Sequence, residues 1–282
     1  MREGVKVRRA CRIMGISTAS PYRKPAPGND AELREKLRET WRPNMGYRMA
    51  HALVKPAFGR LNVKRVHRIW KEEKLGRMKR YRKKRTSETV PLSAERPNHV
   101  WCIDFIFDSC LNGTKLKILA VKDEFTKECL VLEVRTRFRS RDVQRTLEAC
   151  FAEYGVPERL RSDNGSEFIA RTLAVFLAQS GTGAHFIAPG SPWQNGFIES
   201  FNSRLRAECL DVEVFYNLAD SQVKLAVYRR WYNEERPHSS IGNVAPALFR
   251  ARSLDSGWAT PSLHPKSAMT QTTAETLVIP SS

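Results

Sequence analysis

The stretch "HVWCIDFIFDSC", residues 99–110, alternates large apolar side chains with smaller or polar ones. Trp101, Ile103, Phe105 and Phe107 occupy every second position, a pattern that predicts a half-buried β-strand. Asp104 lies in the middle of this strand, where an unpaired carboxylate would be costly to bury. The sequence therefore predicts that something nearby compensates the charge of Asp104.

Two more acidic residues occupy unusual places further along the chain. Asp163 ends a short strand-like run in "RSDNGSEF", and Glu199 lies in the first turn of a helix predicted over "GFIESFNSRLRAECL". Strand-like runs at 116–125 and 128–138 precede them, and helices alternate with short strands afterwards. The order β-β-β-α-β-α-β-α predicts an α/β fold, a mixed sheet with helices packed on it.

Each acid also has an ordinary explanation. Asp163 could form an Asx turn, Glu199 could complement a helix dipole, and Asp104 could pair with a buried arginine. Their joint occurrence favours a different interpretation, because three converging carboxylates repel one another unless a cation lies between them. Mg²⁺ takes oxygen ligands of this kind, and two such ions stabilise the attacking and leaving oxygens of phosphoryl transfer.

The net charge of +18 is confined to one part of the chain. Residues 1–100 carry 27 basic and 9 acidic side chains, whereas residues 101–282 carry 21 of each. Seven of the nine residues in "RMKRYRKKR", 77–85, are basic. A basic segment of this kind predicts nucleic acid or an anionic membrane as partner, the alternative being an arm that only improves solubility.

Residues 30–76 contain three short helical patterns. The last one, capped by Asn62, places Val63, Val66 and Trp70 on one face and turns its basic side chains elsewhere. This arrangement predicts a helix-turn-helix-like domain whose last helix enters the major groove. The alternative is a structural bundle with a solvated outer face.

The remaining features indicate a protein of the cytoplasm. The six cysteines are scattered without a C-x-x-C pair, as expected of small buried side chains in a reducing compartment. No apolar run approaches the roughly 18 residues of a membrane span, and no signal peptide is evident. His185 and His238 are interpreted as packing residues rather than metal ligands.

These residues together resemble a known family. Asp104 and Asp163 are separated by 58 residues, and Asp163 and Glu199 by 35. With "SPWQNGFIESFNSRLRAE" and "YNEERPHSSIGNVAP", this spacing is similar to that of the OrfB-type product of bacterial insertion-sequence transposases, in the family named for insertion sequence three. Those proteins share a ribonuclease H-like DDE core with retroviral integrases. Unlike the retroviral proteins, this sequence has no His/His/Cys/Cys spacing for a zinc domain.

The patterns along the sequence, together with this resemblance over residues 8 to about 250, predict five segments. They are a partial helical segment (1–29), a helical DNA-binding domain (30–76), a basic linker (77–98), a ribonuclease H-like integrase catalytic core (99–250) and a disordered tail (251–282). Asp104, Asp163 and Glu199 would be the catalytic residues and would bind two Mg²⁺ or Mn²⁺ ions. DNA contacts are expected from Lys64, Arg65, Arg68, Arg77, Lys79, Arg80, Arg82, Lys83, Lys84, Arg85, Gln194, Asn195 and Arg206.

The implied activity is DNA cleavage and strand transfer during transposition. The expected partners are double-stranded DNA, both element ends and target, further copies of the chain, and the product of the upstream reading frame; no membrane is expected. The expected place is the bacterial cytoplasm, at the nucleoid. Two other interpretations stay open: a non-catalytic DNA-binding regulator that is a partial product of a frameshift fusion, and a simple nuclease.

Overall fold

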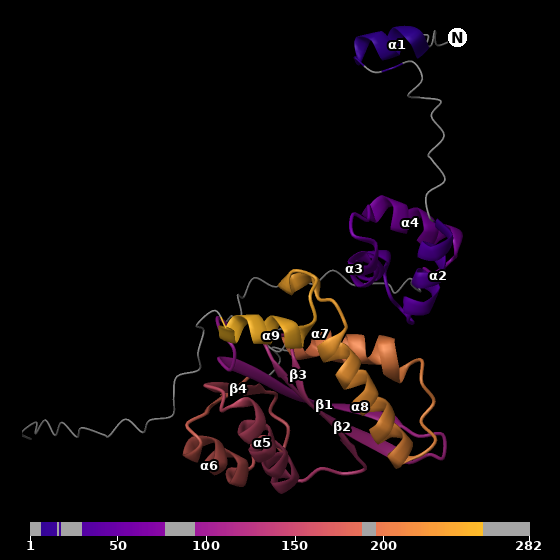
Figure 1. The fold of residues 1–282 in the computed structure, drawn as a ribbon. Coiled ribbons are helices and arrows are strands. Elements are labelled where there is room, and N and C mark those ends of the chain that lie inside the picture. Colours follow the sequence, from indigo (N-terminus) through magenta and orange to yellow (C-terminus); the bar gives the residue numbers. More distant parts are fainter. Residues whose placement is uncertain (1–6, 16, 18–29, 77–93, 188–195, 256–282) are drawn as a thin grey trace, which may run out of the picture.

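Five strands form one mixed sheet in the computed structural model, which describes residues 7–15, 17, 30–76, 94–187 and 196–255 (Figure 1). The spatial order is β3-β2-β1-β4-β5. Strands β1 to β3 are antiparallel neighbours, whereas β1 pairs with β4, and β4 with β5, in parallel. The strands are β1 (Val100–Ser109), β2 (Lys115–Asp123), β3 (Cys129–Arg135), β4 (Arg159–Ser162) and β5 (Gly183–Phe186).

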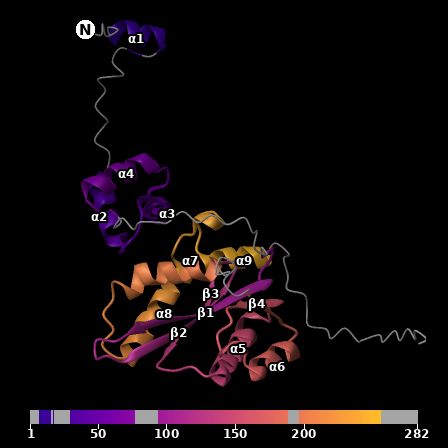
Figure 2. The same cartoon turned by 180° about the vertical axis from the view of Figure 1, so that it is seen from behind.

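Helices cover both faces of this sheet (Figures 1 and 2). On one face lie α7 (Gly196–Leu205) and α8 (Leu218–Glu234), which share an apolar core with Cys102 and Ile106 of β1. On the other face α5 (Ser140–Tyr154) and α6 (Arg171–Gln179) pack against Trp101 and Ile103. The alternation in β1 thus supplies both cores, and the predicted mixed sheet with flanking helices is confirmed.

Residues 30–76 form the predicted three-helix unit. Its helices are α2 (Asp30–Thr40), α3 (Tyr47–Phe58) and α4 (Val63–Glu72), and Asn62 caps α4 through the backbone N–H of Lys64 at 2.8 Å. Leu33, Leu37 and Trp70 belong to a core of their own, because each helix presents one apolar face to the other two. Of residues 1–29, the structure describes a short helix α1 (Val7–Ile13).

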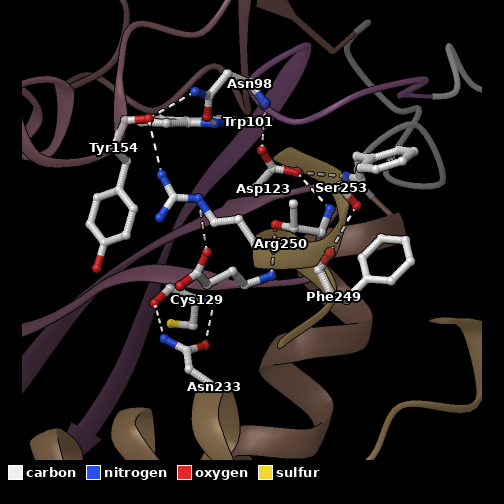
Figure 3. A network of polar contacts seen from close by, with 12 residues as sticks. Asn98, Trp101, Asp123, Cys129, Tyr154, Asn233, Phe249, Arg250 and Ser253 are labelled. Carbon is white, nitrogen blue, oxygen red and sulfur yellow. Dashed lines mark hydrogen bonds and ion pairs between the residues drawn. The ribbon is translucent and has the colours of Figure 1, made fainter. Parts of the chain in front are cut away.

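The core extends past both of its expected boundaries (Figure 3). Asn98, assigned to the linker, is buried and accepts a hydrogen bond from Trp101 Nε1 at 3.1 Å, while its backbone N–H donates to Asp123 at 2.8 Å. At the other end, α9 (Pro246–Asp255) enters the segment expected to be a disordered tail. Within that segment Ser253 is buried and donates to the backbone oxygen of Phe249 at 2.8 Å. Arg250, at the expected end of the core, lies 3.6 Å from Glu128 and donates to the backbone oxygen of Tyr154. Polar contacts that join distant segments, which no local pattern reveals, therefore set these boundaries.

A short π-helix, η3 (Arg206–Leu210), directly continues α7. The sequence predicts one uninterrupted helix over 196–210, so the widened turn is a difference from expectation. Within the described part of the chain, none of the helices is both long enough and apolar enough to span a membrane.

Candidate active site

Asp104 lies on the sheet face that α7 covers. Cys102 and Ile106, two residues to either side, belong to the core beneath α7 and α8, so the pleat turns Asp104 the same way. The half-buried carboxylate accepts a hydrogen bond from the backbone N–H of Phe105 at 2.8 Å and from Asn202 Nδ2 at 2.7 Å. Each of its two oxygens therefore has a hydrogen-bond donor.

Asp163 follows directly after β4, the parallel neighbour of β1. Cys102 pairs with Arg161 in the register, and continuing this register by two residues brings Asp163 beside Asp104. The Asp163 carboxylate accepts from the backbone N–H of Gly165 at 3.0 Å, which is an Asx turn. A side chain at Gly165 would begin 3.1 Å from Asp163 Oδ1, so the glycine lets the chain turn closely around this acid.

Glu199 lies in the first turn of α7 and is half-buried. Ile198, Phe201 and Leu205 anchor the helix on the sheet. Asn202 follows Glu199 by three residues, which places both on one face of the helix. Because Asn202 bonds to Asp104, that face is turned toward β1.

The electrostatics of Asp104 reflect the other two acids. The pKa of Asp104 is raised to about 6, chiefly by burial and in smaller part by the charges of Asp163 and Glu199, while the hydrogen bonds from Phe105 and Asn202 act against this increase. The three carboxylates therefore lie near enough for the charges of two of them to act on the third. The ordinary explanation for Asp104 was a buried arginine; the buried Arg161 on the neighbouring strand lies 2.7 Å from the carboxylate of Glu124.

The donor chemistry fits a hard divalent cation, because the acids offer carboxylate oxygens on one face of the sheet. Asn202 Oδ1, beside Asp104, is also buried and accepts no hydrogen bond from any described residue. However, among the residues that the structure describes, no three His, Cys, Asp or Glu side chains are grouped closely enough to hold one ion. Like charges without a cation between them favour such separation.

The predicted DNA contacts of α4 have partners within their own domain. Arg65 Nε lies 2.8 Å from Asp30 Oδ1, and Arg68 lies 2.7 Å from the other oxygen of the same carboxylate. The two arginines lower the pKa of Asp30, Arg68 more than Arg65. Lys64 is exposed on the surface of the helix. Contact of Arg65 or Arg68 with phosphate therefore competes with their ion pairs to Asp30.

Arg206, at the start of η3, reaches back to the strand that carries Asp104. Its guanidinium donates to the backbone oxygen of Phe107 at 2.9 Å and lies 3.7 Å from Asp211. The other predicted DNA contacts, Gln194, Asn195 and the basic run 77–85, lie outside the described residues.

The two histidines differ in their surroundings. His238 is buried edge-on against the ring of Tyr232, with ring centroids 4.7 Å apart. Burial, followed by the nearby cations Arg236, Lys122 and Arg204, lowers the pKa of His238 to about 2, so the ring is neutral. His185 is half-buried on β5. The surroundings of His238 agree with a packing role.

Asn202, which lies beside the acids and donates to Asp104, was not predicted from the sequence. Its separation of 98 residues from Asp104 gives no local signal. Its place one turn after Glu199 was, however, a usable signal, since residues three apart share a helix face.

Comparison with known proteins supports the fold and indicates the family to which the chain belongs. Two profiles described as "Integrase core domain" match residues 94–192 and 180–246. A 39.2 kDa protein of insertion element IS476 from Xanthomonas euvesicatoria is 39% identical over 253 residues, 86% of this chain and 72% of that protein. A 31.7 kDa protein of insertion element IS407 from Burkholderia multivorans is 36% identical over 263 residues, 89% of this chain and 94% of that protein.

A solved structure with the same fold is a chain of the simian T-cell lymphotropic virus intasome bound to the PP2A regulatory subunit B56 gamma. The TM-score is 0.50 and the identity 15%, with 82% of this chain and 81% of that chain covered. The sheet, its flanking helices and the matched profiles define the class of integrases and transposases with a ribonuclease H-like core. Within it, this chain belongs to the bacterial insertion-sequence transposases, in the family named for insertion sequence three.

Proposed function

We propose that the chain cleaves DNA at the ends of an insertion sequence and joins the resulting 3′-hydroxyl to a target strand, with Asp104, Asp163 and Glu199 as catalytic residues. The observation that carries the proposal is the effect of Asp163 and Glu199 on Asp104, whose pKa both charges raise. Acids at the end of β4 and on α7 thus act on an acid of β1 that is far from both in the sequence. A hard cation would stabilise three such carboxylates, which repel one another when no cation lies between them.

In this proposal, the residues of the chain hold and orient the reacting groups. Asp104, Asp163 and Glu199 would be the ligands of two Mg²⁺ or Mn²⁺ ions. When bound, these ions supply charge stabilisation to the attacking and leaving oxygens. Phe105 N–H and Asn202 orient Asp104, and the turn at Gly165 orients Asp163. Arg206 and the basic N-terminal third hold the phosphate backbone, and further copies of the chain bring two DNA ends together.

The purified 282-residue chain, incubated with Mg²⁺ and a labelled duplex taken from the DNA that flanks its gene, tests the proposal. We expect nicked strands that end in a 3′-hydroxyl and, with added target DNA, joined products. Nicked fragments without joined products would instead indicate a simple nuclease.

A second candidate is a DNA-binding regulator without catalysis. One observation favours it: among the described residues, no three potential ligands are close enough to hold an ion. Binding of the same duplex without any nicking, in Mg²⁺ and in Mn²⁺, would support this candidate over the enzyme.

Asn202 offers a test of how Asp104 is oriented. We expect Asn202→Ala to raise the Mg²⁺ concentration at half-maximal joining by about 10- to 100-fold. Residues that orient a metal ligand usually contribute that much to metal affinity or activity. Asn202→Asp should be at least as harmful, since it replaces the donor at 2.7 Å with another negative charge. The measurement is the Mg²⁺ concentration at half-maximal joining, together with the Mg²⁺-induced shift in melting temperature. Ser203→Ala, on the exposed side of the same helix, is the control; equal effects of Ser203→Ala and Asn202→Ala would contradict the role.

The basic run 77–85, which lies outside the described residues, is expected to supply much of the DNA affinity. Replacing its seven basic residues with glutamine should weaken binding at low salt. The slope of log affinity against log salt concentration should become shallower by roughly 0.9 for each phosphate that the protein no longer neutralises. Unchanged affinity and slope would mean that the run only connects the two domains.

A further inference from the structure

The turn between α2 and α3, residues 41–46, contacts the segment that follows the active-site helix (Figures 1 and 2). Asn44 Nδ2 donates to the backbone oxygen of Ala207 at 2.6 Å. Beside it, the guanidinium of Arg42 lies 4.7 Å from the centroid of the Trp231 ring. One short turn thus makes a hydrogen bond and a cation–π contact with two different elements of the core.

The backbone of the turn holds Asn44 in a fixed orientation. Asn44 has φ +59°, in the left-handed region, which asparagine enters more readily than most side chains. Met45 follows it, is fully buried in the core of the helical domain, and donates its backbone N–H to the backbone oxygen of Arg42 at 3.1 Å. The amide of Asn44 is therefore presented by a turn that is anchored on both sides.

The core residues that Arg42 and Asn44 contact are also held in place by their neighbours. Trp231 of α8 is buried apart from a small exposed part, and Arg236 lies 6.0 Å from the same ring. Arg236 in turn donates two hydrogen bonds to Glu208, at 2.8 and 2.6 Å. Glu208 is the neighbour of Ala207, so the hydrogen bond and the cation–π contact fall on one connected polar cluster.

Ala207 and Glu208 belong to η3, which continues α7 without a break. In η3 the N–H of Asp211 bonds to the oxygen of Arg206, five residues earlier, so this turn is wider than an α-helical one. The same continuous segment carries Glu199, Asn202 and Arg206. The helical domain is therefore attached to the backbone that holds one of the three acids.

We infer that Arg42 and Asn44 are positioning residues that fix the distance between the DNA held by the helical domain and the site of cleavage. The inference rests on the proposed function, because it concerns where the cut falls. A duplex bound by α2–α4 enters the active site at a set offset only if the domain and the α7–η3 segment keep one relative placement. The contact of Arg42 and Asn44 supplies that placement.

The contact itself is tested without DNA by hydrogen–deuterium exchange on the full chain. The variant Arg42→Ala/Asn44→Asp removes the cation and turns an acceptor toward the oxygen of Ala207, while aspartate still tolerates the left-handed backbone. We expect faster exchange in peptides covering 205–213 and an unchanged rate in β1 and β2. Arg60→Ala, which removes one exposed positive charge from the same domain, is the control and should leave both regions unchanged. Unchanged exchange at 205–213 in the double variant would overturn the contact.

The positioning role is tested on the same proteins with the end-containing duplex. We expect the double variant to bind the duplex within about threefold of wild type and to join strands at least about tenfold more slowly, a change of about 1.4 kcal/mol in the barrier. Its cuts should spread over neighbouring positions, whereas wild type and Arg60→Ala cut at one. Asn44→Gly, which keeps the backbone but removes the amide, should show an intermediate spread.

The outcomes separate this inference from the proposed function. A single, unshifted cut position at a normal rate in the double variant would overturn the positioning role even though the enzyme is active. An inactive wild-type chain would refute the proposed function and the positioning role with it, while the exchange experiment would still report on the contact.

Discussion

Asp104→Asn, Asp163→Asn and Glu199→Gln should each lower Mg²⁺-dependent strand joining by about 100- to 1,000-fold or more, the loss that follows removal of a group stabilising charge in a transition state. The amides keep the shape of the side chains, so the sheet and α7 should stay intact. An amide, however, is a neutral and weaker ligand for a hard cation. The measurement is the rate of appearance of joined product, with each variant saturated with DNA.

DNA affinity separates loss of chemistry from loss of binding. We expect the three variants to bind the end-containing duplex as tightly as wild type or more tightly, because each loses one negative charge near the phosphates. Asp108→Asn is a matched control: it makes the same change on the same strand, four residues beyond Asp104. If any of the three retains nearly normal joining while Asp108→Asn does too, the assignment of the site is wrong.

The central strand and the candidate acids could be predicted because their signals are local. Alternating side chains in 99–110 indicated β1, and the acids stood out as charges in apolar or turn-forming surroundings. Asp163 shows that an ordinary explanation and a functional one are compatible. It does form an Asx turn with Gly165, and that turn holds the same carboxylate whose charge acts on Asp104.

What could not be predicted depends on contacts between distant segments. Arg65 and Arg68 were interpreted as cations on an outer helix face, but Asp30 of another helix lies between them. Ordered structure continues past both expected ends of the core, because Asn98 is held by Asp123 far along the chain and α9 runs on to Asp255, with Ser253 buried. No periodicity in 30–76 or 246–255 encodes these pairings.

A buried ion pair next to the candidate site leads to the largest expected change in stability. Arg161 of β4 and Glu124, at the end of β2, lie 2.7 Å apart, with side chains 1% and 0% exposed. We expect Arg161→Met to lower the free energy of unfolding by about 3–5 kcal/mol at pH 8, where Glu124 is ionised, because it removes the cation that acts most strongly on this buried carboxylate. Urea unfolding followed by circular dichroism measures the change. Arg159→Met, an exposed arginine on the same strand, is the control and should change stability by less than about 0.5 kcal/mol.

The pH dependence identifies the cause of that loss. Burial raises the pKa of Glu124 to about 7, although Arg161 acts against this rise, so the folded state holds the proton at pH values where the unfolded chain, near 4.5, has released it. The stability contributed by the protonated form is therefore complete below about pH 4.5 and is lost as the pH rises through about 7. Without Arg161 the folded pKa rises further, so Arg161→Met should be clearly more destabilising at pH 8 than at pH 5. Adding Glu124→Gln to Arg161→Met should restore most of the free energy of unfolding lost at pH 8 and remove the difference between the two pH values. If Arg161→Met instead lowers the free energy of unfolding equally at pH 5 and pH 8, poorer packing rather than an uncompensated charge is the cause.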